Sequence, residues 1–197
     1  MLTPHSDRDR FVRRIGNMRP TAVSFQGVIV RSTTPKYATE TDLVTGEGSR
    51  RYGGRWNPIG VAAVYGSLTP ETAMAETLAH HRYFQLPIEA VMPRTFVAIE
   101  ARLRRVLDLT DGAVRQRLRV SERRLTSTDW RRDNDAGREA LTQAIGFAAF
   151  TTGFEAILAP SAQDETGTGN LIIFPGNLLK SSRVEVRNPA GLQTPAG

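Results

Sequence analysis

The order of strands and helices is the strongest constraint that this sequence places on its fold. Runs rich in β-branched and apolar residues predict strands, and they occupy residues 25–31, 61–67, 94–101, 105–109, 155–161, 170–175 and 182–186. Two segments, 69–84 and 138–153, have the composition and end signals of longer helices. Because the strands do not alternate regularly with these helices, the order favours an α+β fold over a doubly wound parallel sheet.

The segment 69–84 is the clearest helix in the sequence. Thr69 can cap its first turn, and Pro70 suits the first helical position. Glu76 and Tyr83 are seven positions apart, so a helix places them on one face, beside the inward-facing stripe. Glu76 is therefore expected at the edge of the buried face of this helix.

The remaining segments have weaker signals. Residues 32–60 carry Gly, Pro, Thr and Ser throughout, and we expect a long loop there. Residues 111–135 are polar and weakly helical. We expect residues 1–24 to be a basic arm or short helix that is loosely attached, residues 25–187 to form one domain, and residues 188–197 to be a disordered tail.

The composition is typical of a globular protein, with 40% apolar and 23% charged residues in a chain of 197. No run of about 18 apolar residues is present, so a membrane-spanning helix is not expected. The N-terminus lacks the apolar stretch of a secretory signal, and a cytoplasmic location is the expectation. Cysteine is absent, which excludes disulfides and thiolate metal ligands.

The net charge of +6 comes almost entirely from arginine and has three interpretations. A basic face could bind nucleic acid, or it could bind an acidic protein partner. It could equally be a solvated basic surface with no ligand. The arginines are scattered along the chain, and no nucleic-acid-binding motif occurs among them.

Polar residues near predicted strand ends are the main candidates for a functional site, because a metal site is not expected. The three histidines are His5, His80 and His81, and adjacent histidines on a helix point about 100° apart. The candidate residues are Arg31, Arg55, Tyr65, Glu76, Ser161 and Asn170.

Each candidate also has a purely structural interpretation. A glutamate at the edge of a helix is most often solvated or paired with a cation. Tyr65 can pack in the core with its hydroxyl satisfied, and Arg55 can stack on the neighbouring Trp56 ring. Taken one at a time, these residues leave a structural and a functional interpretation open.

Together, the candidates resemble the signature of the RES domain family. The stretch GGRWNPIGVAAVYGSLTPETAMAET, residues 53–77, carries the matching residues Gly54, Arg55, Trp56, Gly60, Tyr65, Ala73 and Glu76. The later stretch ILAPSAQDETGTGNLIIFP, residues 157–175, matches the family at Ser161 and Asn170, and VIVRS matches it at Arg31. The resemblance covers about residues 25–187.

This resemblance implies a fold, an activity and a partner. RES domains resemble ADP-ribosyltransferases, with a split β-sheet core around an NAD⁺ cleft. They are toxins of bacterial toxin–antitoxin pairs that consume NAD⁺, and some members are similar to transferases that place ADP-ribose on a host protein. The implied partner is an antitoxin with an Xre-type DNA-binding region and a segment that covers the cleft. Neither a metal, nor direct contact with nucleic acid, nor a membrane is implied.

The residue types suit cleavage of the nicotinamide–ribose bond of NAD⁺. Glu76 is the carboxylate that would stabilise the positive charge on the ribose, with Arg55 and Tyr65 as further catalytic residues. An Arg fork matches phosphate oxygens, and glycine lets a backbone approach a ligand closely. The implied NAD⁺-binding set is Arg31, Gly54, Arg55, Tyr65, Ser161 and Asn170.

The acceptor of the ADP-ribose group is left open by these residues. Water, phosphate and a protein side chain would all attack the same cation, so the resemblance implies phosphorolysis, hydrolysis or protein transfer. The alternative to an NAD⁺-consuming enzyme is a basic module that binds nucleic acid, for which the net charge is the one argument.

Overall fold

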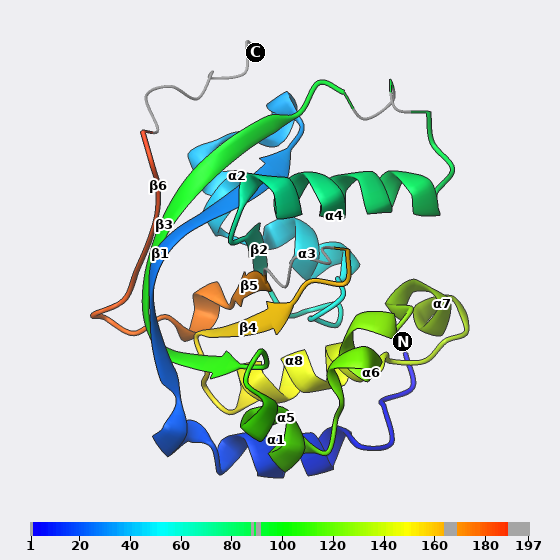
Figure 1. Ribbon diagram of the computed structural model, residues 1–197, viewed down its shortest axis with the longest axis vertical. Helices are drawn as coiled ribbons and strands as arrows, with labels where there is room; N and C mark the ends of the chain where they lie inside the picture. Colours follow the sequence, from blue (N-terminus) through cyan, green and yellow to red (C-terminus); the bar gives the residue numbers. More distant parts are fainter. Residues whose placement is uncertain (1, 88, 90–91, 164–168, 189–197) are drawn as a thin grey trace.

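The computed structural model describes residues 2–87, 89, 92–163 and 169–188, and Figure 1 shows the course of the chain. Residues 189–197 of the expected tail lie outside the described residues, and so do residues 164–168 of the Gly- and Thr-rich connection. In the described part of the chain, no helix is both long and apolar enough to cross a membrane.

Six strands form one sheet in the order β1-β2-β5-β4-β3-β6, and β1 pairs in addition with β3. The strands are β1 (Val23–Thr33), β2 (Val64–Ser67), β3 (Thr95–Asp108), β4 (Ala156–Pro160), β5 (Gly169–Ile173) and β6 (Arg183–Val186). The pairing of β3 with β4 is parallel, and the other pairings are antiparallel. Strands β1 and β3 run side by side as a long curved ribbon along one side of the molecule (Figure 1).

The helices gather at the two ends of this ribbon and beside the shorter strands (Figure 1). They are α1 (Arg8–Gly16), α2 (Glu40–Val44), α3 (Glu47–Tyr52), α4 (Pro70–Tyr83), α5 (Gly112–Leu118), α6 (Glu122–Ser127), α7 (Trp130–Asp135) and α8 (Leu141–Thr151). Short 3₁₀ turns occur at η1 (Arg19–Thr21), η2 (Pro35–Tyr37) and η4 (Pro175–Asn177). The mixture of helices with a largely antiparallel sheet confirms the predicted α+β class.

Helix α4 forms where its end signals predict it. The hydroxyl of Thr69 accepts a hydrogen bond from the backbone N–H of Thr72 at 3.2 Å, and Pro70 is the first helical residue. Ala73 is buried on its inward face. The helix packs on β1 and β2.

The strand predictions need two corrections. The strand predicted over 61–67 begins only at Val64, and the two strands predicted over 94–101 and 105–109 are parts of a single strand, β3 (Thr95–Asp108). The alternation of buried and exposed side chains continues through the expected break, where Ala101 and Leu103 are buried while Arg102 and Arg104 are exposed. Long charged side chains are compatible with a strand when they point to the solvent face. The two arginines therefore do not interrupt the strand.

The prediction of a long loop over residues 32–60 is also wrong. Strand β1 continues to Thr33, and the helices α2 and α3 follow. Thr39 caps α2 by accepting a hydrogen bond from the N–H of Asp42 at 3.1 Å. Ser49 of α3 exchanges two hydrogen bonds with the backbone of Ala63, at 2.7 and 2.8 Å, which ties this segment to the start of β2.

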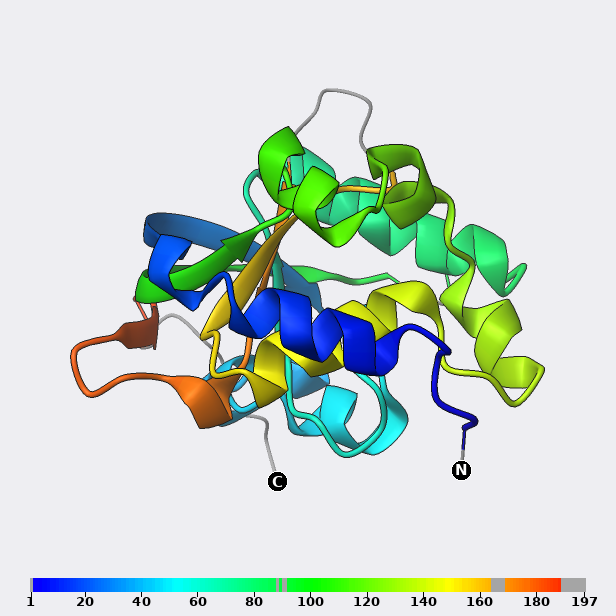
Figure 2. The same cartoon turned by 90° about the horizontal axis from the view of Figure 1, so that it is seen from below.

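The N-terminal segment contains a short helix, as one of the two expectations had it, but residues 8–16 are not loosely attached. Helix α1 lies along α8 (Figure 2), and its Phe11 and Ile15 are completely buried in the core. Arg8 forms a salt bridge with Glu139, whose side chain is 1% exposed. The polar composition misled the prediction because only one stripe of this short helix is apolar.

We expect Ile15→Val to lower the free energy of unfolding by about 0.5–1.5 kcal/mol, because Ile15 loses a buried methylene group at a fully packed site. Urea denaturation followed by circular dichroism measures this difference. Arg13→Gln on the exposed face of α1 is the control and should leave the midpoint in place. An unchanged midpoint for Ile15→Val would mean that α1 is not part of the cooperative unit.

Candidate active site

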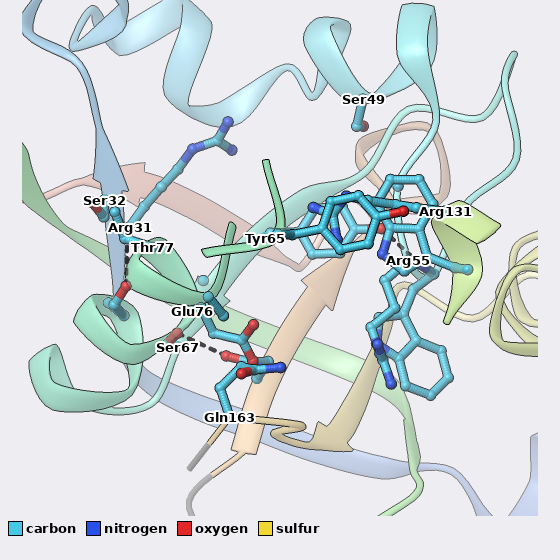
Figure 3. A pocket seen from close by; sticks show the side chains of 18 of the residues that line it. Arg31, Ser32, Ser49, Arg55, Tyr65, Ser67, Glu76, Thr77, Arg131 and Gln163 are labelled. Carbon is cyan, nitrogen blue, oxygen red and sulfur yellow. Dashed lines mark hydrogen bonds between the residues drawn. The ribbon is translucent and has the colours of Figure 1, made fainter. Parts of the chain in front are cut away.

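A large pocket lies between α4, the sheet and the segment 126–131, and it has a volume of about 1040 Å³. This volume is at the upper end of the range of roughly 300–1,000 Å³ for small-molecule sites. Its walls come from β1, β2, α3, α4, the glycine loop (residues 53–56) and the segment 126–131. Figure 3 shows Glu76 within it, with Arg31 on one side and Arg55 and Arg131 on the other.

Glu76 of α4 is held by side chains from two other elements. The hydroxyl of Ser161, just after β4, and the amide Nδ2 of Asn170 on β5 each donate a hydrogen bond to its Oε1 at 2.8 Å. Oε2 accepts no hydrogen bond from the described residues. The carboxylate is therefore held through Oε1 at the wall of the pocket. The structure thus brings together three of the residues that the sequence analysis selected.

Ser67 belongs to the same chain of hydrogen bonds and was missed in the sequence. Its hydroxyl donates to Oδ1 of Asn170 at 2.7 Å, which fixes the amide so that Nδ2 faces Glu76. Ser67 lies two residues after Tyr65 on β2, and alternate residues of a strand share a face. That spacing is the signal in the sequence that could have identified it.

The hydroxyl of Tyr65 makes two hydrogen bonds that hold the glycine loop and the residue after it in place. Its hydroxyl donates to Oδ1 of Asn57 at 2.6 Å and accepts a hydrogen bond from the N–H of Trp56 at 2.9 Å. Burial raises the pKa of the Tyr65 hydroxyl, so it stays protonated as a donor. A Cβ at Gly54 would lie 2.6 Å from this hydroxyl, which explains the glycine there. In this structure the hydroxyl positions the loop, while the ring lines the pocket.

Helix α8 also contacts the backbone of the glycine loop. The buried amide Nε2 of Gln143 donates to the carbonyl oxygen of Gly54 at 3.0 Å. At Gly146 a Cβ would lie 1.6 Å from the carbonyl oxygen of Trp56, so the loop backbone packs directly on the helix. Trp56 itself is buried in the core. The glycine loop is therefore fixed in position before any ligand binds.

Arg55 makes contacts that neither interpretation of the sequence foresaw. Its guanidinium donates to the carbonyl oxygens of Leu125 at 2.6 Å, Thr126 at 2.7 Å and Thr128 at 3.1 Å. No cation–π contact with Trp56 occurs among the described residues. Burial lowers the pKa of Arg55, and attraction to the nearby Glu76 opposes that shift. Arg55 thus ties the glycine loop to the end of α6.

The pocket is rich in arginine. Arg31 of β1 lines it, and its Nη1 donates to the carbonyl oxygen of Leu43 at 3.3 Å. Burial lowers the pKa of Arg31 as well, with Asp42 acting in the opposite direction. Five arginines line the pocket against two carboxylates; the arginines are Arg31, Arg55, Arg82, Arg94 and Arg131, and the carboxylates are Glu76 and Asp129. Such a surplus of positive charge favours an anionic ligand.

Three of these arginines were missed in the sequence, because nothing local to them signals a pocket. Arg94 reaches it through a hydrogen bond from its Nε to the hydroxyl of Ser32 at 3.0 Å. Arg131 reaches it because α7 lies beside the end of α4. Among the described residues, no group of three His, Asp or Glu side chains is arranged to hold a metal ion.

The chain is similar to two curated proteins that act as a phosphorylase or an ADP-ribosylating toxin. The NAD(+) phosphorylase MbcT of Mycobacterium tuberculosis is 26% identical over 158 residues, which cover 79% of this chain and 78% of that protein. The Prs ADP-ribosylating toxin of a Sphingobium species is 38% identical over 58 residues, or 29% of this chain and 36% of the toxin.

The solved structure of the M. tuberculosis MbcT–MbcA toxin–antitoxin complex contains a chain with the same fold. Its TM-score to this protein is 0.68 at 23% sequence identity, and the match covers 91% of this chain and 93% of that one. The RES domain model matches residues 28–192, close to the range over which the signature residues were recognised. The chain therefore belongs to the RES domain family.

Proposed function

We propose that this protein is the toxin of a bacterial toxin–antitoxin pair and that it cleaves the nicotinamide–ribose bond of NAD⁺. The observation that carries the proposal is Glu76, whose Oε1 is held by Ser161 and Asn170 inside a pocket with an excess of arginine. Two relatives, a phosphorylase of NAD⁺ and an ADP-ribosylating toxin, support the same substrate. NAD⁺ is the substrate here, and the reaction proposed uses no metal.

The geometry suggests how the bond is broken. The nicotinamide leaves with the electron pair of its bond to C1′ of the ribose, and positive charge develops on the ribose ring. The carboxylate of Glu76 stabilises this charge, because a fixed anion in a partly desolvated pocket needs no reorganisation during the reaction. The acceptor then forms its bond to C1′. Ser161 and Asn170 hold the carboxylate in place, and the arginines attract the diphosphate.

Further features of the proposal are inferred from membership of the RES domain family. We infer an ADP-ribosyltransferase-like core in the sheet around the pocket, and an Xre-type antitoxin that covers this pocket in a cytoplasmic complex. A host protein is one possible acceptor, beside phosphate and water. The alternative of a basic nucleic-acid-binding module rests on the net charge of +6, yet five of the arginines behind that charge line the pocket.

Product analysis with labelled NAD⁺ tests the proposal and identifies the acceptor. The protein is incubated with NAD⁺ alone, with inorganic phosphate, and with a cell lysate. Release of nicotinamide supports the proposed function. ADP-ribose 1″-phosphate, free ADP-ribose or labelled protein then indicates phosphorolysis, hydrolysis or transfer, respectively. Intact NAD⁺ under all three conditions contradicts the proposal.

We expect Ser67→Ala to lower kcat for NAD⁺ cleavage about fivefold with little change in KM. Without the Ser67 hydroxyl, the amide of Asn170 is no longer held toward Glu76, and a net hydrogen bond is worth about 1 kcal/mol. Steady-state kinetics measures the two constants. Ser127→Ala, at an exposed position of the pocket rim, is the matched control. A kcat within twofold of the wild type would mean that Asn170 is positioned without Ser67.

A further inference from the structure

The rim of the pocket carries three aromatic side chains grouped around an arginine, and the cleavage step does not use them. We name it the rim cluster, and it consists of Tyr83, Phe84, Trp130 and Arg131. The guanidinium of Arg131 lies 4.4 Å from the centre of the Trp130 ring, 4.8 Å from that of Tyr83 and 5.5 Å from that of Phe84. Helix α4 and the 126–131 segment thus meet at this cluster.

Two aromatic rings of the rim cluster are exposed to solvent. Tyr83 is 42% and Phe84 is 49% exposed, and the two rings pack edge to face at 5.1 Å. Single exposed apolar residues are common on protein surfaces, whereas aromatic rings gathered at the mouth of a pocket indicate a ligand. Flat rings together with an arginine form a surface on which a nucleobase stacks.

The position of the cluster relative to Glu76 indicates which part of NAD⁺ reaches it. Glu76 and Tyr83 lie on the same face of α4, seven residues or ~10 Å apart along the helix axis. Glu76 acts at the nicotinamide ribose, so a group at this distance belongs to the other end of an extended dinucleotide. Arg131 lines the same side of the pocket as Arg55 (Figure 3), where its charge can attract the intervening diphosphate.

Resting on the proposed function, we propose that the rim cluster binds the adenine base of NAD⁺ by stacking. The cluster therefore sets the preference for a dinucleotide over a substrate that ends at the nicotinamide nucleotide. The three rings gather around the Arg131 guanidinium, and the exposed rings of Tyr83 and Phe84 offer the stacking surface. Tyr52, on α3, is another exposed aromatic residue of the same pocket, and it is the competing location for the base.

The test compares NAD⁺ with nicotinamide mononucleotide, which contains the same scissile bond but no adenylate. In Tyr83→Leu and Phe84→Leu, the ratio of kcat/KM for NAD⁺ to kcat/KM for the mononucleotide should fall about 5- to 150-fold, mostly through KM for NAD⁺. This range corresponds to the stacking of one base on an aromatic ring. Tyr37→Leu, equally exposed but outside the pocket, is the control and should preserve the ratio.

Two outcomes overturn the inference while leaving the proposed function in place. In one, NAD⁺ is cleaved and the ratio is unchanged in both rim variants. In the other, Tyr52→Leu lowers the ratio and the rim variants do not. Failure of the wild type to cleave NAD⁺ is a different result, which contradicts the proposed function.

A binding measurement tests the rim cluster without any turnover. The chain has two tryptophans, and Trp56 is 3% exposed, so a base that stacks at the rim should quench Trp130 selectively. Titration with adenosine monophosphate should give saturable quenching of tryptophan emission in the wild type. This quenching should disappear in Trp130→Phe. The absence of saturable quenching in the wild type would contradict adenine binding at the cluster.

Discussion

Replacing Glu76 by glutamine is expected to lower kcat for NAD⁺ cleavage by a factor of about 10³ or more. Glutamine has nearly the same shape as glutamate, and its Oε1 can still accept the hydrogen bonds from Ser161 and Asn170. The variant therefore keeps its fold but lacks the negative charge that stabilises the developing cation. Removal of a single preorganised electrostatic group commonly lowers kcat by roughly 10²–10³. A full charge opposite the cation should be worth at least as much.

The measurement is nicotinamide release under saturating NAD⁺, accompanied by a thermal unfolding curve for each variant. Glu71→Gln is a matched control, because Glu71 is an exposed glutamate of the same helix outside the main pocket. It should retain full activity, and Glu76→Gln should unfold at nearly the wild-type temperature. If Glu76→Gln kept more than a tenth of the activity, another group would have to stabilise the ribose cation.

Local signals were sufficient to predict several elements of the fold. Thr69 and Pro70 mark the start of α4, and the hydrogen bond from Thr72 to Thr69 confirms this start. Strands β4 and β5 were recognised as short apolar runs, because both are buried in the core. Such features depend on neighbours within one or two turns, and a single sequence contains that information.

Elements held in place by distant residues were harder to predict. Helix α1 looked loosely attached because its contacts with α8 involve residues more than a hundred positions away. The helix α2 was overlooked in a Gly- and Thr-rich segment, although Thr39 and Asp42 form a capping pair that could have marked its start. The capping residue Thr39 was visible in the sequence, but the Gly- and Thr-rich composition of the segment led to the prediction of a loop.

The site itself was predicted mainly through the family resemblance. Residue types alone left Glu76, Tyr65 and Arg55 with structural alternatives, and the structure shows that such an alternative partly holds for two of them. The Tyr65 hydroxyl and the Arg55 guanidinium both make hydrogen bonds that fix the glycine loop. Their partners are backbone groups and an amide whose positions depend on the folded chain, so no spacing in the sequence reveals them.

Replacing Arg55 by methionine is expected to lower both the free energy of unfolding and the rate of NAD⁺ cleavage. Arg55 lines the pocket, and its hydrogen bonds also connect the glycine loop to the 126–131 segment. The substitution removes the donors to the carbonyl oxygens of Leu125, Thr126 and Thr128. Carbonyl groups left without a partner cost about 1–3 kcal/mol each when they are buried, and we expect a total loss of about 3 kcal/mol. The position of the 126–131 segment should also become less defined, which should lower kcat/KM for NAD⁺ at least tenfold.

Urea unfolding without ligand separates this role from a contact with NAD⁺ alone. A residue that contacts only the ligand would weaken NAD⁺ binding and leave the unfolding midpoint unchanged. Arg55→Lys should restore little of the stability, because one ammonium group cannot reproduce the planar fork that reaches three carbonyl oxygens. Arg51→Met, which removes an exposed arginine of α3, is the control and should unfold at the wild-type midpoint. An unchanged midpoint for Arg55→Met would show that these hydrogen bonds do not stabilise the fold.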